Sequence, residues 1–220
     1  MQEIFLKFQM TTEEYLLKHI DEVPEYLKVI ERRTWVQQLN PRMVSGALQG
    51  RLLAMLCAMI RPANILEIGT YTGYSALCLA ENLAADGKLH TIEIDDELED
   101  TIRENFALSP FSEKLILHIG EALKIIPSLN ETFDLVFIDA DKRDYLAYYD
   151  AVFPKIKPGG YILADNTLWD GKVLQPVSEK DTQTIEIMKF NDFITQDKRV
   201  KQVILPLRDG LTIIQKINDN

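Results

Sequence analysis

The sequence is poor in cysteine and histidine. Of its 220 residues, two are cysteines and three are histidines. Cys57 and Cys78 each lie in an apolar, helix-like segment, which favours buried thiols over a disulfide. His19, His90 and His118 lie outside any HExxH, CxxC or GxSxG pattern. The sequence therefore supports neither a zinc protein nor a serine hydrolase.

Signals for membranes and secretion are also missing. No uninterrupted apolar run approaches the roughly 20 residues that a membrane-spanning helix needs. The N-terminal stretch MQEIFLKFQMTTEEY carries acidic residues and lacks the basic, apolar and small-residue regions of a signal peptide. We therefore expect a cytoplasmic protein without a membrane partner.

Basic residues are outnumbered by acidic ones. The 24 lysines and arginines stand against 34 aspartates and glutamates, so the formal net charge is −10 at pH 7. Nonspecific nucleic-acid binding requires a basic surface, and nucleic acid is therefore a disfavoured partner. Lys28, Arg32 and Arg33 have helical spacing, and we interpret them as a solvated helix face.

The chain does contain a regular alternation of strand and helix patterns, preceded by a helical segment. Residues 11–20, 24–39 and 45–60 predict three helices. Strand-like segments then alternate with helical ones, at 64–69, 88–94, 114–120, 133–140 and 160–166. The last two strands, at 200–207 and 211–217, are joined by a connection short enough for a hairpin.

These patterns predict an α/β fold. Five strand–helix units indicate a Rossmann-like, doubly wound and mostly parallel sheet of seven strands, whose C-terminal hairpin adds an antiparallel strand at or near an edge. The length suits a single domain, with residues 1–60 as an N-terminal helical segment and 61–220 as the core. Ligands bind such sheets outside the carboxyl ends of the strands.

The first two strand ends carry residues typical of nucleotide-binding sheets. Gly69 and Gly73 bracket a strand-to-helix turn, but the third glycine of GxGxxG and the lysine of a P-loop are missing. Glu93 stands 20 residues after Gly73, where such sheets place an acid that accepts hydrogen bonds from ribose hydroxyls. We expect a nucleoside cofactor. An NAD-binding oxidoreductase and a noncatalytic nucleoside-binding module stay open as alternatives.

The fourth and fifth strands end in oxygen-bearing side chains. Asp139 ends one strand, and Asp165 and Asn166 end the next. If the strands are neighbours, these side chains form an all-oxygen set that suits Mg²⁺ or Ca²⁺ rather than zinc. Each residue alone is also common in caps and turns. Lys142 follows three residues after Asp139, and near a cation its neutral form can accept a proton. An ion pair with a neighbouring aspartate is the simpler alternative.

Three segments together resemble a known enzyme family. LEIGTYTGYSAL, FIDADKRDYLAYY and ILADNTLWDGKV are similar to segments of the cation-dependent class I O-methyltransferases, which use S-adenosylmethionine. The chain resembles most closely the caffeoyl-CoA O-methyltransferase group and its bacterial relatives, with catechol O-methyltransferases more distant. The resemblance extends from about Met43 to the C-terminus. It implies methyl transfer to a hydroxyl of a catechol-like phenolic small molecule, by a homodimer.

The resemblance also implies a role for each matching residue. The implied S-adenosylmethionine contacts are Ser45, Glu67, Gly69, Thr70, Ser75, Glu93, Ala122, Asp139 and Asp141. Asp139, Asp165 and Asn166 would ligate Mg²⁺ or Ca²⁺, and the catalytic residues would be Asp139 and Lys142, with the lysine as the base. The stretch GALQG departs from the family, because many relatives carry an acidic residue just before the glycine.

A tRNA wobble-uridine O-methyltransferase, which uses the same cofactor and metal, stays open as an alternative. The segments DADK and DNTLWDG and the acidic balance resemble the phenolic-substrate branch more closely. Residues 1–42 and the loop 169–180 are expected to shape acceptor specificity. Trp169 and Tyr145 are candidate walls for an acceptor ring, although aromatic residues more often belong to the core.

Overall fold

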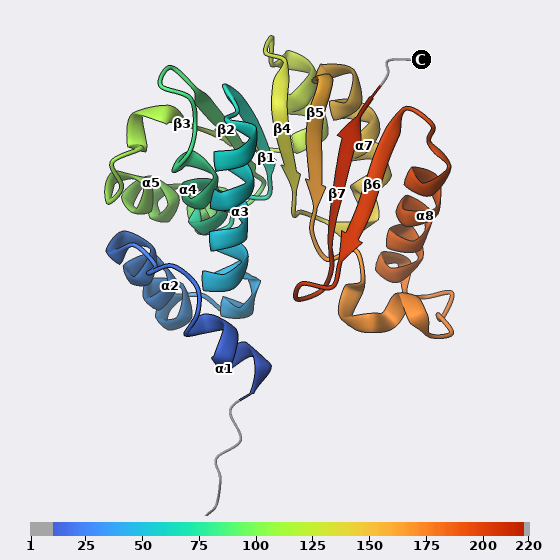
Figure 1. Ribbon diagram of the computed structural model, residues 1–220, viewed down its shortest axis with the longest axis horizontal. Coiled ribbons are helices and arrows are strands. Elements are labelled where there is room, and N and C mark those ends of the chain that lie inside the picture. Colours follow the sequence, from blue (N-terminus) through green and yellow to red (C-terminus); the bar gives the residue numbers. More distant parts are fainter. Residues whose placement is uncertain (1–10, 218–220) are drawn as a thin grey trace, which may run out of the picture.

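The computed structural model describes residues 11–217 as a seven-stranded sheet with helices on both faces (Figure 1). The strands are β1 (Asn64–Ile68), β2 (Lys88–Glu93), β3 (Leu115–Ile119), β4 (Phe133–Ile138), β5 (Ile156–Ala164), β6 (Val200–Leu205) and β7 (Leu211–Lys216). Their order across the sheet is β3-β2-β1-β4-β5-β7-β6. Strands β1 to β5 are parallel, and β7 is antiparallel to both β5 and β6. The predicted fold class is confirmed.

The predicted helices are present with adjusted ends. They are α1 (Thr12–Leu17), α2 (Glu25–Gln37), α3 (Gly46–Ile60), α4 (Tyr74–Ala80), α5 (Glu99–Ala107), α6 (Ala122–Ile125), α7 (Tyr145–Val152) and α8 (Thr182–Gln196). The segment EALKIIPSL, residues 121–129, predicts one helix after the third strand, but α6 is much shorter and continues as a 3₁₀ turn, Ile126–Ser128. Pro127 explains the change, because proline has no N–H to donate and its ring disfavours a helix interior.

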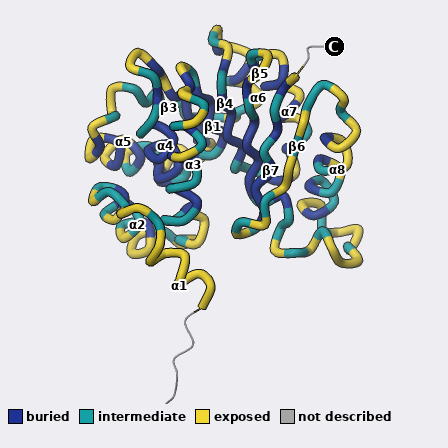
Figure 2. The backbone as a smooth tube through the Cα atoms, in the orientation of Figure 1, coloured by how far each residue is buried: buried dark blue, intermediate teal, exposed yellow. Residues whose placement is uncertain are grey.

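Two apolar cores lie on opposite faces of the sheet. Successive side chains of a strand point to opposite faces, so each central strand contributes to both. Ile65 and Leu135 pack in the core that includes α3, α4 and α5. Leu66 and Val136 pack in the core that includes α7 and α8. Figure 2 shows the central strands as the most continuously buried part of the chain. The sheet is therefore covered on both sides and open to ligands only at its edges.

The C-terminal hairpin places its second strand beside the parallel strands. β7 pairs with β5, and β6 is outermost, so the antiparallel strand lies one position in from the edge. Because β6 runs in the same direction as β1 to β5, it ends at the same edge of the sheet as they do. The β6–β7 turn, residues 206–210, therefore lies beside the carboxyl ends of the parallel strands.

One stretch of the described residues is long and apolar enough to cross a membrane by length and composition alone. It is Pro41–Ile60, with a mean hydropathy of 1.5 over its best window, and it includes α3. Core helices pass the same test, and α3 packs against α4 with Leu53, Ala54 and Cys57 buried. The expectation that no apolar segment reaches this length holds only for uninterrupted runs.

Candidate functional site

A pocket of about 1230 Å³ opens at the carboxyl edge of the parallel strands. It extends from the turn after β1, past the ends of β4 and β5, to the segment before α3 and the β6–β7 turn. The predicted site residues that line it are Ser45, Gly69, Thr70, Ser75, Glu93, Ala122, Asp139, Asp141, Lys142, Asp165 and Asn166. The topology thus brings together residues from six separate segments of the chain.

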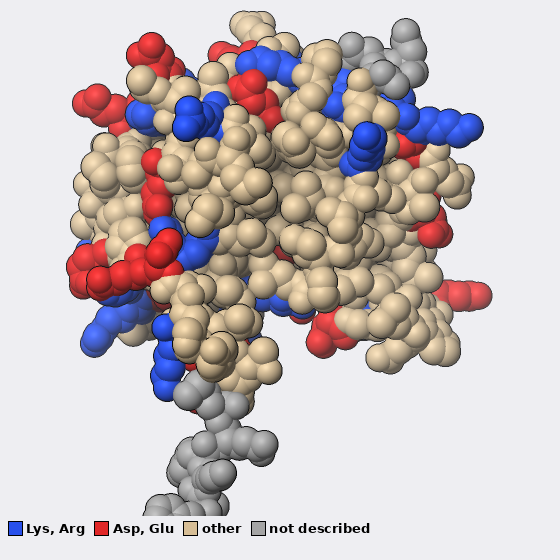
Figure 3. Space-filling view, in the orientation of Figure 1, with Lys and Arg blue, Asp and Glu red and all other residues tan. Residues whose placement is uncertain are grey.

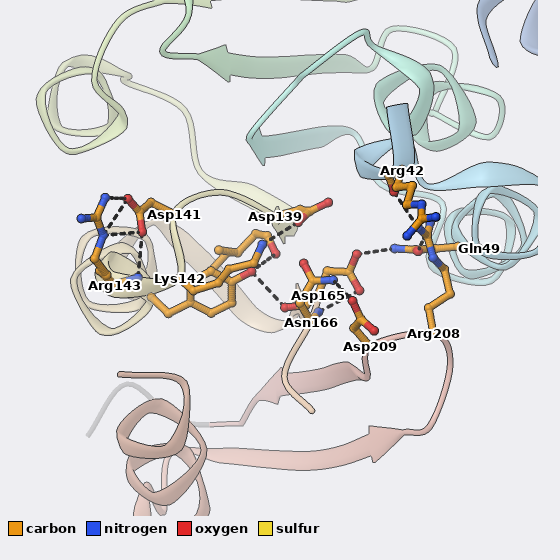
Figure 4. A network of polar contacts seen from close by, with 12 residues as sticks. Arg42, Gln49, Asp139, Asp141, Lys142, Arg143, Asp165, Asn166, Arg208 and Asp209 are labelled. Carbon is orange, nitrogen blue, oxygen red and sulfur yellow. Dashed lines mark hydrogen bonds and ion pairs between the residues drawn. The ribbon is translucent and has the colours of Figure 1, made fainter. Parts of the chain in front are cut away.

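Asp139 and Asp165 are side by side at the ends of neighbouring strands. The ladder of hydrogen bonds continues past the strands, because Asp139 donates its N–H to the Ile68 carbonyl and Asp165 donates to the Ile138 carbonyl, each at 2.9 Å. Such neighbouring strands lie about 4.8 Å apart, and residues in register point to the same face. Figure 4 shows the two side chains close to one another. The predicted pairing of the two carboxyl groups is therefore present.

Gly69 is required by the packing of the strand ends themselves. Its φ is 96°, a left-handed conformation that favours glycine. A Cβ at this position would lie 2.1 Å from the carbonyl oxygen of Asp139. The turn that opens the pocket therefore lies directly against the backbone at the end of β4, where the side chain of Asp139 begins.

Glu93 connects the two loops that form the nucleoside side of the pocket. Its Oε2 accepts the backbone N–H groups of Thr70 and Tyr71 at 3.1 and 2.7 Å. Its Oε1 accepts those of Ile94 and Asp95 at 2.9 and 3.0 Å. A carboxylate has about four lone-pair sites, and all four are used here. Binding of ribose hydroxyls, as predicted, would require Glu93 to share its oxygens with these loops.

Glu67, one of the implied cofactor contacts, does not line the pocket. It is fully buried, and burial raises the pKa of its carboxyl group to about 8. The Thr91 hydroxyl donates to Glu67 Oε2 and is itself hydrogen-bonded to the hydroxyl of Thr70, which does line the pocket. Glu67 is therefore connected to the pocket through two hydroxyl groups, and its direct contact with a cofactor stays a prediction.

Asp165 is nearly buried and tightly constrained. Burial raises the pKa of Asp165 to about 7, and the adjacent charge of Asp139 contributes to the same shift. Hydrogen bonds oppose this shift, since Gln49 Nε2 donates to Oδ2 at 2.7 Å and the Asn166 N–H donates to Oδ1 at 2.9 Å. Lys142 already places one positive charge beside Asp139. A further positive charge near both carboxyl groups would reduce the repulsion between Asp139 and Asp165.

Lys142 forms an ion pair with Asp139 within the pocket wall. Its side chain is 9% exposed, and its Nζ lies 2.9 Å from Asp139 Oδ1. Burial lowers the pKa of Lys142, but the charge of Asp139 and the contact with Tyr145 outweigh burial and raise the pKa above its ordinary value. Here Lys142 is therefore an ammonium ion, and its role as a base stays a prediction. Asp141 pairs instead with Arg143.

The two candidate aromatic walls have different positions. Tyr145 is fully buried and donates its hydroxyl to the Asp165 carbonyl at 2.9 Å, so it belongs to the core, the more common alternative for an aromatic residue, and not to the pocket wall. Its hydrogen bond to Asp165 fixes the backbone at the end of β5. Trp169 does line the pocket, and the Lys142 ammonium lies 5.9 Å from its ring centroid. An aromatic ring beside a cation can form a wall for a planar ligand.

Sequence reasoning did not single out Arg208 and Asp209, which line this pocket, or Gln49, which is buried and contacts one of its carboxyl groups. Gln49 contacts Asp165, Arg208 contacts Gln49 Oε1 at 3.2 Å, and Asp209 Oδ2 lies 3.5 Å from Asn166 Nδ2 (Figure 4). Arg208 and Asp209 are in the β6–β7 turn, which the sequence shows only as a hairpin connection. The direction of β6 was the available signal, because a strand parallel to the others must end at the ligand-binding edge.

The oxygen set fits a divalent cation by chemistry. Within residues 11–217, no group of three or more histidine, cysteine, aspartate or glutamate side chains is arranged to hold a metal ion. The predicted set has only two such groups, because its third member is the amide of Asn166. Two in-register carboxyl groups and an amide oxygen are hard ligands of the type that Mg²⁺ and Ca²⁺ prefer.

Comparison with known proteins places these features in a family. Residues 18–217 match the O-methyltransferase family. The chain is 32% identical over 206 residues to a caffeoyl-CoA O-methyltransferase of Petroselinum crispum, covering 89% of this chain and 85% of the relative.

Two solved structures are similar over nearly the whole chain, each with a TM-score of 0.86. The O-methyltransferase TomG of Streptomyces achromogenes, involved in tomaymycin synthesis and in complex with S-adenosylmethionine, is 28% identical, covering 93% of this chain and 95% of that one. The O-methyltransferase of Bacillus cereus, in complex with S-adenosylhomocysteine, is 27% identical, covering 92% and 96%. The bound ligands of these neighbours support S-adenosylmethionine as the cofactor of the pocket described here.

Proposed function

This chain belongs to the O-methyltransferase family, and we propose that it transfers the methyl group of S-adenosylmethionine to one hydroxyl of a catechol-like phenolic small molecule, with Mg²⁺ or Ca²⁺ as a second cofactor. The observation that carries the proposal is the register of Asp139 and Asp165. It sets two carboxyl groups side by side at the strand ends, directly beside the Gly69 turn where the family places its methyl donor.

The pocket offers two regions with different chemistry. Glu93, Thr70 and the backbone of the glycine turn form the side suited to a nucleoside. Asp139 and Asp165 form the second region, at the ends of β4 and β5. This arrangement supports a donor bound across the β1 and β4 ends, with its sulfonium directed toward the carboxyl pair.

Asp139, Asp165 and Asn166 are the residues that would hold the cation. When bound, such a cation supplies positive charge that stabilises a phenolate and orients a vicinal diol through two of its open positions. A phenol near pKa ~10 is otherwise mostly neutral at pH 7 and a poor nucleophile. The carboxyl pair therefore favours acceptors that carry two adjacent hydroxyls.

The transfer itself requires alignment and a place for one proton. The acceptor oxygen forms a bond with the methyl carbon as the carbon–sulfur bond breaks, and alignment of this kind can contribute about 7–11 kcal/mol. The hydroxyl proton goes to Lys142. A cation held by Asp139 would disfavour the positively charged form of this lysine, and its neutral amine can then accept the proton. Trp169 would face the acceptor ring.

A methyl-transfer screen tests the proposal. The purified chain is incubated with S-adenosylmethionine and, separately, with catechols, hydroxycinnamoyl thioesters, flavonoids and hydroxyuridine tRNA, with and without EDTA. We expect transfer to vicinal diols that EDTA abolishes and that Mg²⁺ or Ca²⁺ restores. Full activity in EDTA would contradict the metal role, and transfer to hydroxyuridine tRNA alone would replace the phenolic acceptor.

A further inference from the structure

One arginine of the β6–β7 turn holds the segment before α3 against the pocket. The Arg208 guanidinium donates to the backbone carbonyls of Arg42 at 3.1 Å and Val44 at 2.9 Å, and also to that of Ser45. A fourth acceptor is the side-chain Oε1 of Gln49. All four acceptors belong to residues 42–49, so a single planar guanidinium fixes this whole segment to the far end of the chain (Figure 4).

Gln49 extends this contact to the carboxyl pair. It is 1% exposed, and its Nε2 donates to Asp165 Oδ2 at 2.7 Å. The orientation of its amide group is determined by its partners, because an arginine can only donate and a carboxylate can only accept. Oε1 must therefore face Arg208, and the N–H must face Asp165.

Asp165 is thereby held on both of its oxygens. Oδ2 accepts from Gln49, and Oδ1 accepts the N–H of Asn166 at 2.9 Å. These two bonds fix the plane of the carboxyl group and leave the remaining lone pairs of each oxygen for a ligand. Without Gln49, Oδ2 would be buried beside Asp139 with one hydrogen bond fewer, which is costly for a charged group.

The same turn also contacts the loop after β5. The Asp209 carbonyl accepts the N–H groups of Leu168 at 2.7 Å and Trp169 at 3.1 Å. Neighbouring residues of one short turn therefore bind the segment before α3 on one side and the loop that carries Trp169 on the other. A displacement of Arg208 would reach both walls of the pocket.

We propose that Arg208 and Gln49 are a positioning pair for methyl transfer: Arg208 orients the Gln49 amide, and Gln49 orients the Asp165 carboxylate that faces the acceptor. The inference deepens the proposed function and rests on it for the role of Asp165. Partners that orient a ligand in this way typically contribute about 10- to 100-fold to metal affinity or activity, so about that loss is expected.

A double-mutant cycle on methyl transfer tests whether the two residues act as one unit. Gln49→Leu and Arg208→Met are each expected to lower kcat about 10- to 100-fold, with a much smaller change in KM for S-adenosylmethionine. The double variant is expected to be no slower than the slower single variant, because both remove the same orientation of Asp165. Arg208→Lys keeps the positive charge but loses the planar guanidinium with its several N–H donors, so its kcat is expected to be close to that of Arg208→Met. Losses that multiply, or an unchanged kcat in Arg208→Met, would overturn the pairing.

Matched controls come from β6 and from the residue that precedes it. Gln202→Leu removes a glutamine that donates to the Thr195 hydroxyl at 2.9 Å, and Arg199→Met removes an arginine paired with Asp197. Neither residue lines the large pocket. Both controls are expected to keep kcat near that of the wild type even where they reduce thermal stability, which separates positioning from a general loss of structure.

A second measurement needs neither acceptor nor cation. In ¹⁵N-labelled, ligand-free protein, the Gln49 side-chain amide is identified by its absence in Gln49→Leu. Its protons are expected to exchange slowly with water in the wild type and in Arg199→Met, and much faster in Arg208→Met. Unchanged exchange in Arg208→Met would refute the orientation of Gln49 by Arg208. A protein that shows the expected exchange but methylates no acceptor would contradict the proposed function alone.

Discussion

Asp139 stands between the two predicted cofactors. Its backbone carbonyl lies against Gly69 in the glycine turn, and its carboxyl group accepts from the Lys142 ammonium and repels the charge of the neighbouring Asp165. In the proposed function the side chain would hold the cation, whereas the nucleoside would be bound mainly by the backbone of the glycine turn and by Glu93. Turnover and cofactor affinity should therefore depend on this residue to different degrees.

We predict that Asp139→Ala abolishes turnover and keeps much of the cofactor affinity. The variant removes one of the two carboxyl ligands but leaves the glycine turn and Glu93 unchanged. Calorimetry with S-adenosylhomocysteine and a methyl-transfer assay measure the two effects. Asp192→Ala, at an exposed position of α8, is the control and should change neither. Turnover near the wild-type rate in Asp139→Ala would remove this residue from the reaction.

Lys142→Ala is expected to lower the methyl-transfer rate by about 10²- to 10⁴-fold, which is the usual contribution of general acid–base catalysis. The reason is that, among the described residues that line the pocket, Lys142 is the basic side chain hydrogen-bonded to Asp139. Single-turnover kinetics measure the chemical step directly. Lys189→Ala, in an exposed pair with Glu186, is the control. An unaltered rate would exclude Lys142 as the base.

Glu67 gives a prediction about pH and stability. In the folded chain the pKa of Glu67 is about 8, against an ordinary value of 4.5, because the carboxyl group is fully buried. Between these two pH values the folded state keeps a proton that the unfolded state loses, so the contribution of Glu67 to stability falls as pH rises. Glu67→Gln is neutral at every pH. Its stability relative to the wild type should rise from pH 5 to pH 8, by on the order of a few kcal/mol at most.

Thermal unfolding of both proteins at several pH values, without cofactor, measures this difference. Comparison with Glu186→Gln, at an α8 position paired with Lys189, shows what an ordinary carboxyl group contributes. If the difference in stability between Glu67→Gln and the wild type stayed constant from pH 5 to pH 8, Glu67 would be ionised in the folded chain throughout this range.

At the scale of elements, the β6–β7 turn is the part of the fold that joins distant segments at the pocket. Gly210 has a φ of 92°, and its carbonyl accepts the Thr167 N–H at 3.0 Å. A Cβ there would lie 2.5 Å from Leu168 Cγ. The close approach of the turn to the loop after β5 thus depends on a residue without a side chain.

Gly210→Ala should destabilise the chain and reduce methyl transfer, because the new methyl group would push the turn away from Leu168. Overpacking of this kind typically costs about 1–3 kcal/mol. Gly159→Ala is a matched control, since Gly159 also has a positive φ, of 81°, but a Cβ added there would meet no atom within 4 Å. Chemical denaturation measures both. Equal losses in the two variants would mean that backbone strain alone is responsible.

Local patterns in the sequence were sufficient to predict the elements and the placement of the carboxyl pair. Apolar runs located the strands, and Asp139 and Asp165 were expected side by side because neighbouring parallel strands end at the same edge of the sheet. The contact of Arg208 with residues 42–49 could not be predicted in this way, because it joins segments at opposite ends of the chain and no periodicity describes it. Tyr145 shows the same limit, since its sequence position does not reveal that it is buried beneath β5.

At the scale of the whole molecule, the fold places every wall of the pocket at one edge of a sheet that is covered on both faces. On the face drawn in Figure 3, acidic and basic side chains are interspersed, although the chain as a whole carries a net charge of −10. A homodimer in the cytoplasm stays a prediction. The donor, the cation and the acceptor are all expected to meet within this pocket of about 1230 Å³.

Calorimetric titration of MgCl₂ and CaCl₂ into the chain saturated with S-adenosylhomocysteine tests the central claim most directly. We predict one cation site per chain for at least one of the two ions, and its loss in both Asp139→Ala and Asp165→Ala. Absence of binding by either ion in the wild type, or binding that survives both substitutions, would contradict the account.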